Sequence, residues 1–333
     1  MRVLLWVVAG LAVAWAAYWV VGSRTLDSGA RAWFEQQAAE GREAGYADLR
    51  VAGFPYRFDL TIDGLRLADP ASGTAFDTPM LRVYSLAYRP WHIIAALAPE
   101  QTLTLPGQTI AVASDRIETS VVMVPGRDLA LDRLSTVGRD IRATSSLGWT
   151  LGADEVRFAT RRDRDDPLTH EIGLEATRIA PDPRLTRALA EAGGLPDTID
   201  RLRVDAFVTT TAPLDRNAAE TRPQVARIDL RETSLAWGVL TLTARGELTP
   251  DAAGLAQGRI ALTLRNWRVL PPALVAAGII TEPVRPTVEA ALATLAAQSP
   301  DPETLAVPLD FRNGWASLGP LPLGPAPRLR ERP

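Results

Sequence analysis

An uninterrupted apolar run near the N-terminus constrains this chain more than any other feature. Residues 3–21, VLLWVVAGLAVAWAAYWVV, contain no charged side chain. With a helical rise of 1.5 Å per residue the run spans roughly 28 Å, close to the ~30 Å hydrocarbon core of a bilayer. Arg2 precedes it, Arg24 follows it, and Tyr18 and Trp19 near its end suit a membrane interface. We therefore expect residues 1–22 to form a single-pass transmembrane anchor.

A cleaved signal peptide and a buried core helix are the alternatives to an anchor. A signal peptide has an apolar region of about 7–15 residues followed by a small-x-small cleavage site. Here the Ala-x-Ala triplets lie inside the run, and bulky Tyr18 and Trp19 follow them. A core helix would carry a polar stripe, which this run lacks. Retention as an anchor is therefore favoured, although cleavage stays open.

The orientation of the anchor sets the expected location of the rest of the chain. No other apolar run approaches ~18 residues, and only Met1 and Arg2 precede this one, which is the usual layout of a signal anchor. We expect a bacterial inner-membrane protein with its N-terminus in the cytoplasm and the bulk of the chain in the periplasm.

Composition excludes several classes of function. The chain has 333 residues and is 47% hydrophobic, which allows a sizeable core. Its basic residues are all Arg, and with acidic residues in slight excess the net charge is −3, which argues against a nucleic-acid binder. Cys and Lys are absent, and His92 and His170 are the two histidines, so disulfides, thiolate metal sites and Cys nucleophiles are excluded. We expect no metal and no cofactor.

A second helical segment should continue from the anchor over residues 23–46. Leu26, Ala30, Trp33 and Phe34 recur near the helical period, and charged residues occupy the other face. We expect the Trp33–Phe34 pair to pack on the following domain, with the lipid headgroups as the alternative.

The period of the pattern then changes from 3.6 to 2. Phe58, Leu60 and Ile62 alternate with charged or polar residues, and Gly64 marks an irregularity that returns Leu65 to the apolar side. Similar alternation recurs at 80–88, 102–112, 116–124, 155–161, 171–179, 201–211, 224–230, 235–248 and 259–269. This predicts a mainly β fold with few helices (α+β), in which an elongated, curved antiparallel sheet over 47–319 can form a groove. A subdivision near residue 195 is the one candidate domain boundary.

Short helices, one hairpin and a tail complete the prediction. Helices are expected at 91–97, 183–192, 272–280 and 287–298, the last covering a sheet surface or edge. Asn313-Gly314 predicts a tight turn between strands 304–311 and 315–318, because both residues tolerate positive φ. The proline-rich tail, residues 320–333, is expected to be extended or disordered.

Catalytic motifs are scarce. The sequence has no G-x-S-x-G, no G-x-G-x-x-G and no Walker lysine. The run Arg161–Pro167, RRDRDDP, is a solvated loop in our interpretation, since its arginines oppose calcium. We therefore expect no enzyme and assign no catalytic residue.

Two aromatic clusters are interpreted as structural. Gly53, Phe54, Pro55 and Tyr56 would anchor the bend where the membrane-proximal helix meets the first strand, with a lipid or partner contact near the membrane as the alternative. Trp91 would be a buried indole at a strand-to-helix corner.

Three stretches carry a resemblance to a known family. GFPYRFDLTIDGLRLADP at 53–70, LRVYSLAYRPWHIIA at 81–95 and FRNGWASLGPLPLGPAP at 311–327 resemble an uncharacterised family of Gram-negative envelope proteins, domain of unknown function 2125. That resemblance implies a location and a fold but no reaction. At the level of architecture the chain is also similar to AsmA-type envelope proteins, whose groove-forming sheets are associated with lipid homeostasis and phospholipid transport.

The leading hypothesis is that a curved sheet binds or transfers lipid acyl chains in the cell envelope. The side chains expected to face lipid are Phe58, Leu60, Ile62, Val83, Leu242 and Leu264. The alternative is a structural scaffold that docks an envelope protein through its tail or its membrane-proximal helix, without a ligand. A periplasmic hydrolase with a polar cleft is a third class. Expected partners are the inner membrane, a phospholipid or another lipid, or an envelope protein, and not nucleic acid. An open groove and a filled core give the same period-2 pattern, so the sequence leaves them open.

Overall fold

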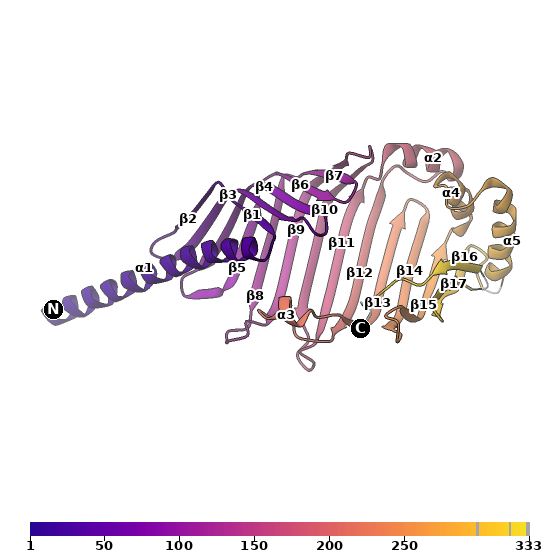
Figure 1. Cartoon of the computed structure of the whole chain (residues 1–333). Coiled ribbons are helices and arrows are strands. Elements are labelled where there is room, and N and C mark those ends of the chain that lie inside the picture. Colours follow the sequence, from indigo (N-terminus) through magenta and orange to yellow (C-terminus); the bar gives the residue numbers. More distant parts are fainter. Residues whose placement is uncertain (298–299, 320, 331–333) are drawn as a thin grey trace. The chain divides into compact units, whose positions relative to one another are not determined.

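The chain folds as two compact units, which are described here one at a time. The structure is a computed structural model and describes residues 1–297, 300–319 and 321–330 (Figure 1). Unit 1 comprises residues 1–124 and 136–149, and unit 2 comprises residues 125–135 and 150–333. Residue 195, the candidate boundary, lies inside unit 2, where Leu195 is only 1% exposed.

Helix α1 (Arg2–Ala39) carries the apolar run and the membrane-proximal segment as one element (Figure 1). Its apolar window has a mean hydropathy of 2.1 and is not buried in protein, so the helix is long and apolar enough to span a membrane. The helix was expected to reach residue 46, and that part of the prediction is wrong. Gly41 adopts a φ of 80°, and the next residues form strand β1 (Glu43–Gly45).

Unit 1 is an antiparallel sheet that branches. Strand β3 pairs with β1 and β2 along one side and with β4 along the other. Strand β4 then pairs with β5 at one end and β6 at the other; β5 continues to β8, and β6 continues through β7 to β9. The further strands are β2 (Asp48–Ala52), β3 (Arg57–Asp69), β4 (Thr74–Leu86), β5 (Arg89–Leu97), β6 (Glu100–Leu105), β7 (Gln108–Ala113), β8 (Arg116–Met123) and β9 (Leu131–Ser145).

The irregularity predicted at Gly64 is confirmed. Gly64 has a φ of 63°, and Ile62 before it and Leu65 after it are both buried in one cluster. The helix predicted at 91–97 is wrong, because these residues lie in strand β5 between β4 and β8. Ile93 and Ile94 favour a strand, and the cross-strand pairs outweigh the helix-start signal of Pro90.

Unit 2 is a meander in which each strand from β10 to β18 pairs with the next, all antiparallel. Its strands are β10 (Thr150–Arg162), β11 (Thr169–Ile179), β12 (Ile199–Thr210), β13 (Val225–Trp237), β14 (Leu240–Pro250), β15 (Ala256–Arg265), β16 (Thr304–Arg312), β17 (Trp315–Leu318) and β18 (Leu321–Pro325). Its helices are α2 (Pro183–Gly193), α3 (Ala218–Thr221), α4 (Leu270–Ala276) and α5 (Arg285–Ala296), with 3-10 turns at Trp267–Val269 and Glu282–Val284. The mainly β, antiparallel fold class is thus confirmed.

Several boundaries differ from the predicted ones. Residues 102–112 are two strands that turn at Gly107 (φ 83°), and residues 235–248 are interrupted by a turn at Gly238 (φ 56°). Strand β9 had no sequence signal strong enough to predict it. The end predicted for the last helix, residue 298, lies outside the described residues.

The C-terminal region confirms one prediction and corrects part of another, since the proline-rich tail was not expected to join a sheet. Asn313 and Gly314 have φ values of 54° and 77°, as the tight hairpin turn requires. The tail, however, forms strand β18 against β17 in the residues that the structure describes, and Ala326 is buried. Pro322 and Pro325 fit because a proline in an outer strand can turn its missing donor away from the ladder. Residues 320 and 331–333 lie outside the described part of the tail.

Candidate functional site

The apolar face of unit 1 is covered by helix α1 from the same chain. Phe34 of α1 is 6% exposed and packs in one cluster with Leu49, Leu60, Ile62 and Leu65, and Leu26 and Ala30 of α1 border that cluster. One continuous helix therefore carries both the apolar run and the residues that complete the core of unit 1. The prediction that the Trp33–Phe34 pair packs on the domain is confirmed for Phe34, whereas Trp33 is 45% exposed.

Three aromatic donors tie the apolar run of α1 to turns of the sheet. Trp15 Nε1 donates to the carbonyl of Pro55 (3.0 Å), Tyr18 Oη to that of Ala87 (2.6 Å), and Trp19 Nε1 to that of Arg57 (2.8 Å). A side chain at Gly22 would approach the Phe58 ring to 2.6 Å, so the helix and β3 lie in close contact there. These contacts fix the position of the helix along the strand.

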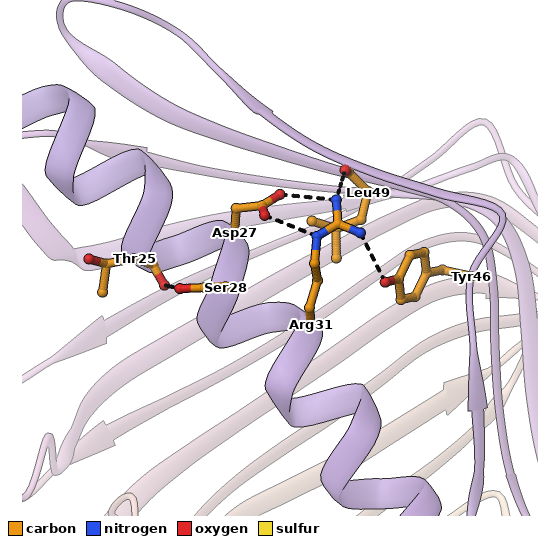
Figure 2. A network of polar contacts seen from close by, with 6 residues as sticks. All are labelled: Thr25, Asp27, Ser28, Arg31, Tyr46 and Leu49. Atoms are coloured by element: carbon orange, nitrogen blue, oxygen red, sulfur yellow. Dashed lines mark hydrogen bonds and ion pairs between the residues drawn. The ribbon is translucent and has the colours of Figure 1, made fainter.

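A polar network centred on Arg31 holds the next turns of α1. Arg31 donates to both carboxylate oxygens of Asp27, to Tyr46 Oη at 3.1 Å and to the carbonyl of Leu49 at 2.8 Å (Figure 2). The hydrogen bond with Asp27 is the main reason why the pKa of Arg31 is raised above its usual value. One planar guanidinium thus links the helix to β2 and to Tyr46, which lies between β1 and β2.

A pocket lies beyond this network, near the C-terminal end of α1. Its volume is about 320 Å³, and its apolar wall is formed by Trp33, Ala44, Leu67, Phe76 and Leu103. Sheet register places Leu67, Phe76, Leu103 and Ile110 in one row across β3, β4, β6 and β7, so apolar surface continues from the pocket along the sheet.

The rim of this pocket carries charges of both signs. Gln37, Arg42, Glu43 and Asp69 line it, and Arg42 is held by Gln37 Oε1 at 2.7 Å and by Glu40 at 3.2 Å. Hydrogen bonds from Ser72 and from the Ala71 amide lower the pKa of Asp69, so its carboxylate stays charged. An apolar wall below a zwitterionic rim can hold an amphiphile.

Five of the six predicted lipid-facing residues lie in packed clusters. Phe58 is buried beside Gly22 and Trp19 of α1, and Leu60, Ile62 and Val83 lie in or against the cluster under the helix. Leu264 and Leu242 pack with Trp267 and α5 in unit 2. Their placement on apolar sheet faces is as predicted, whereas contact with lipid stays a prediction. The pocket residues Phe76 and Leu103 were missed, because strand parity alone does not show where a covering helix ends.

The residues interpreted as structural occupy turns and strand edges. Gly53 has a φ of 104° and accepts a hydrogen bond from the Arg57 amide (2.9 Å), so Gly53–Arg57 forms a tight turn in which Phe54 and Tyr56 point outward with high exposure. Trp91 is partly exposed in strand β5, so the buried helix corner predicted there is wrong.

The two histidines occupy different environments. His92 Nε2 lies 3.0 Å from Ser120 Oγ on the adjacent strand of unit 1. Among the described residues, neither side chain forms a hydrogen bond or ion pair with a carboxylate. His170 is 3% exposed in unit 2 with Thr160 Oγ1 3.4 Å from its Nδ1. Within the described residues no cluster of His, Cys, Asp or Glu is arranged to hold a metal.

Together these features define a mainly β protein whose N-terminal helix is long and apolar enough to span a membrane and also covers part of its own sheet. The family model that matches is DUF2125, described as an uncharacterised protein conserved in bacteria, over residues 19–327. The chain belongs to this family, as its three resembling stretches predicted. No curated protein and no solved structure matches the chain.

Proposed function

We propose that this protein is anchored in the bacterial inner membrane, with both units in the periplasm, and binds an acyl chain of a membrane lipid. The observation that carries the proposal is the pocket of about 320 Å³ at the end of α1. Ligand pockets measure roughly 300–1,000 Å³ and combine an apolar wall with a few polar groups. The size suits a segment of one acyl chain rather than a whole phospholipid.

The position of the pocket on α1 supports a membrane lipid as the ligand. Trp33 follows the end of the apolar run, Val21, by about 18 Å along the same helix at 1.5 Å per residue. A lipid that leaves the bilayer along α1 therefore travels a short distance to reach the apolar wall. At the rim, Arg42 suits a phosphate and Glu43 and Asp69 suit an amine, which together favour a zwitterionic headgroup such as phosphoethanolamine.

The experiment uses the full chain in vesicles that contain phosphatidylethanolamine with a photoactivatable diazirine at the end of one acyl chain. After illumination, mass spectrometry maps the labelled peptides. We expect labelling on the peptides that carry Trp33, Phe76 and Leu103, in addition to the membrane-spanning part of α1.

Two variants and one control make the experiment decisive. Ala44→Trp fills the pocket and Trp33→Ala opens its wall, and each should lower labelling at Phe76 and Leu103 severalfold. Leu147→Trp is the matched control, since Leu147 is 65% exposed in unit 1 and does not line the pocket. Equal labelling in all four proteins, or labelling confined to the span of α1, contradicts the proposal.

The scaffolding alternative keeps less support than the lipid proposal. Its expected docking elements are the tail and the membrane-proximal helix. The described tail pairs with β17 and packs Ala326 and Leu329 into a cluster of unit 2, and α1 turns Phe34 into unit 1. Both elements therefore already make contacts within the chain, and the exposed large apolar side chains of their described residues are Trp33 and Leu323.

A further inference from the structure

Two neighbouring turns of unit 1 present a group of exposed aromatic rings. We name residues 53–57 and 86–90 the basal rim. Phe54 is 58% exposed, Tyr56 67% and Tyr88 56%, although large aromatic side chains usually contribute to cores. The amide of Ala87 donates to the carbonyl of Tyr56 at 2.9 Å, so the two turns form one surface.

The basal rim lies beside the last two turns of the apolar run of α1, before the run ends at Val21. Trp15 and Tyr18 of the helix bond to Pro55 and Ala87 of the rim. From Val3 the helix rises about 18 Å to Trp15 and about 24 Å to Trp19, whereas the hydrocarbon core is about 30 Å thick. With Arg2 at one headgroup layer, the helix therefore still has roughly 6–12 Å of hydrocarbon to cross where it contacts the rim.

The hydrogen bonds of the rim suit an environment with little water. A carbonyl without a partner costs several kcal/mol in hydrocarbon. The side chains of Trp15, Trp19 and Tyr18 each donate a hydrogen bond to one backbone carbonyl of the rim. The acceptors are Pro55 and Ala87, which lie in turns, and Arg57, the first residue of β3. Water would provide the same bonds at an exposed surface, so this arrangement is most useful below the headgroups.

The charged residues of the rim also fit a lipid surface. Arg57 pairs with Asp59 at 2.8 Å, and its guanidinium lies 6.0 Å from the Tyr84 ring centre. Arg89 in the rim and Arg24 on α1 are exposed and have no ion pair within the described residues. Aromatic rings beside arginines are typical of membrane interfaces, where the rings lie at the headgroup level and the guanidinium groups reach phosphates.

We infer that the basal rim is embedded in the headgroup and upper acyl region of the leaflet from which α1 emerges, with phospholipid as its partner. Unit 1 is then held against the bilayer by Phe54, Tyr56 and Tyr88 in addition to the helix. The inference requires that α1 spans the membrane, and it does not depend on ligand binding in the pocket.

The absence of cysteine makes a direct test simple, because each introduced cysteine can be labelled alone. The fluorophore NBD is attached to Phe54→Cys, Tyr88→Cys, Gly10→Cys and Leu147→Cys of the full chain in phosphatidylethanolamine–phosphatidylglycerol vesicles. Phospholipids brominated along their acyl chains serve as quenchers. Gly10 has no neighbouring atom within 4 Å and reports the span, and Leu147, 65% exposed, is the matched apolar control.

We expect strong quenching at position 10, intermediate quenching with a blue-shifted emission at positions 54 and 88, and none at position 147. Shallow bromines should quench the labels at 54 and 88 more strongly than deep ones. The inference is overturned if the labels at 54 and 88 behave like that at 147, and equally if the label at 10 is not quenched. A vesicle result of this kind is independent of the diazirine experiment, so either proposal can fail alone.

Discussion

The apolar faces of the two units are covered in different ways. In unit 1 the cover is α1, whose Phe34 closes the cluster over β2 and β3. In unit 2 the cover is local, because Leu292 and Ala296 of α5 pack with Trp267 on β15 and β16. The helix that is long and apolar enough to span a membrane therefore also completes the core of unit 1, whereas the clusters of unit 2 contain no residue of α1. If α1 spans the membrane as proposed, its insertion is expected to be coupled to the folding of unit 1 and not to that of unit 2.

The cover of unit 2 does not extend over its first strands. Phe158, Leu174 and Val204 are in register across β10, β11 and β12, and all three are half-buried. The hydrophobic clusters found among the described residues of unit 2 contain none of these strands. The same period-2 pattern thus occurs in strands whose apolar face is covered by a helix and in strands whose apolar face is not. The sequence pattern does not distinguish the two cases, because the difference is the position of the helix.

Removing the Phe34 ring, with which α1 closes the core of unit 1, should lower the unfolding free energy more than any other substitution proposed here. Phe34→Ala deletes a ring that is 6% exposed, at a cost of about 3–5 kcal/mol of unfolding free energy. Hydrogen exchange of the full chain in nanodiscs should show lost protection in β2, β3 and β4, with protection in unit 2 unchanged. Trp33→Ala is the neighbouring control, because its ring is 45% exposed and should cost much less.

The reciprocal change tests whether unit 2 is independent. Leu292→Ala, at a residue 1% exposed, should cost about 2–5 kcal/mol and loosen β15 and β16 without affecting β2–β4. If either substitution loosens both units to the same degree, the two units do not fold separately.

A smaller effect is expected from the polar network beside this cover. Arg31→Met removes the bonds to Tyr46 and to the Leu49 carbonyl, so protection of β2 should fall, with a smaller shift of the unfolding midpoint than for Phe34→Ala. Arg31→Lys should not restore it, since one ammonium cannot reach Asp27, Tyr46 and Leu49 together. Arg50→Met is the control, because Arg50 pairs with Asp48 and Asp63 at the surface, where ion pairs contribute little. Equal effects at 31 and 50 would show that the network adds no specific contact.

Local sequence signals predicted the strands well where the pattern was long and pure. The alternation of Phe58, Leu60 and Ile62 predicted β3 correctly. Asn313-Gly314 predicted the turn between β16 and β17 correctly, because a positive φ depends on the residues of the turn themselves. Trp91–Leu97 failed since Pro90 signals a helix start locally, whereas two neighbouring strands decide the outcome. The tail is extended, as one of the two expectations had it, but its pairing was not foreseen, because pairing with β17 tolerates prolines that a central strand would exclude.

The candidate site was harder to predict than the fold. Trp33 was recognised as one of an aromatic pair. Phe76 and Leu103 join it through the register of β3, β4 and β6, and the pairing of β4 with β6 skips strand β5. The contacts of Trp15 and Tyr18 with Pro55 and Ala87 link residues about 40 and 70 positions apart. No period in the sequence encodes contacts of that kind.

The histidines allow the finest comparison, through the pH dependence of each unit. Burial, and then Arg162, lower the pKa of His170 from its ordinary 6.5, with Asp132 opposing the shift. The unfolded chain therefore takes up a proton at a higher pH than the folded unit does, so stability is fully present above about pH 6.5 and falls as the pH drops below it. His170→Gln should flatten this acid decline in the melting temperature of unit 2, followed by hydrogen exchange from about pH 7.5 to about pH 5.5. His92→Gln is the matched control, since His92 is partly exposed beside Ser120 in unit 1 and its loss should leave the decline in place. An unchanged decline in His170→Gln would mean that other groups of unit 2 take up the proton.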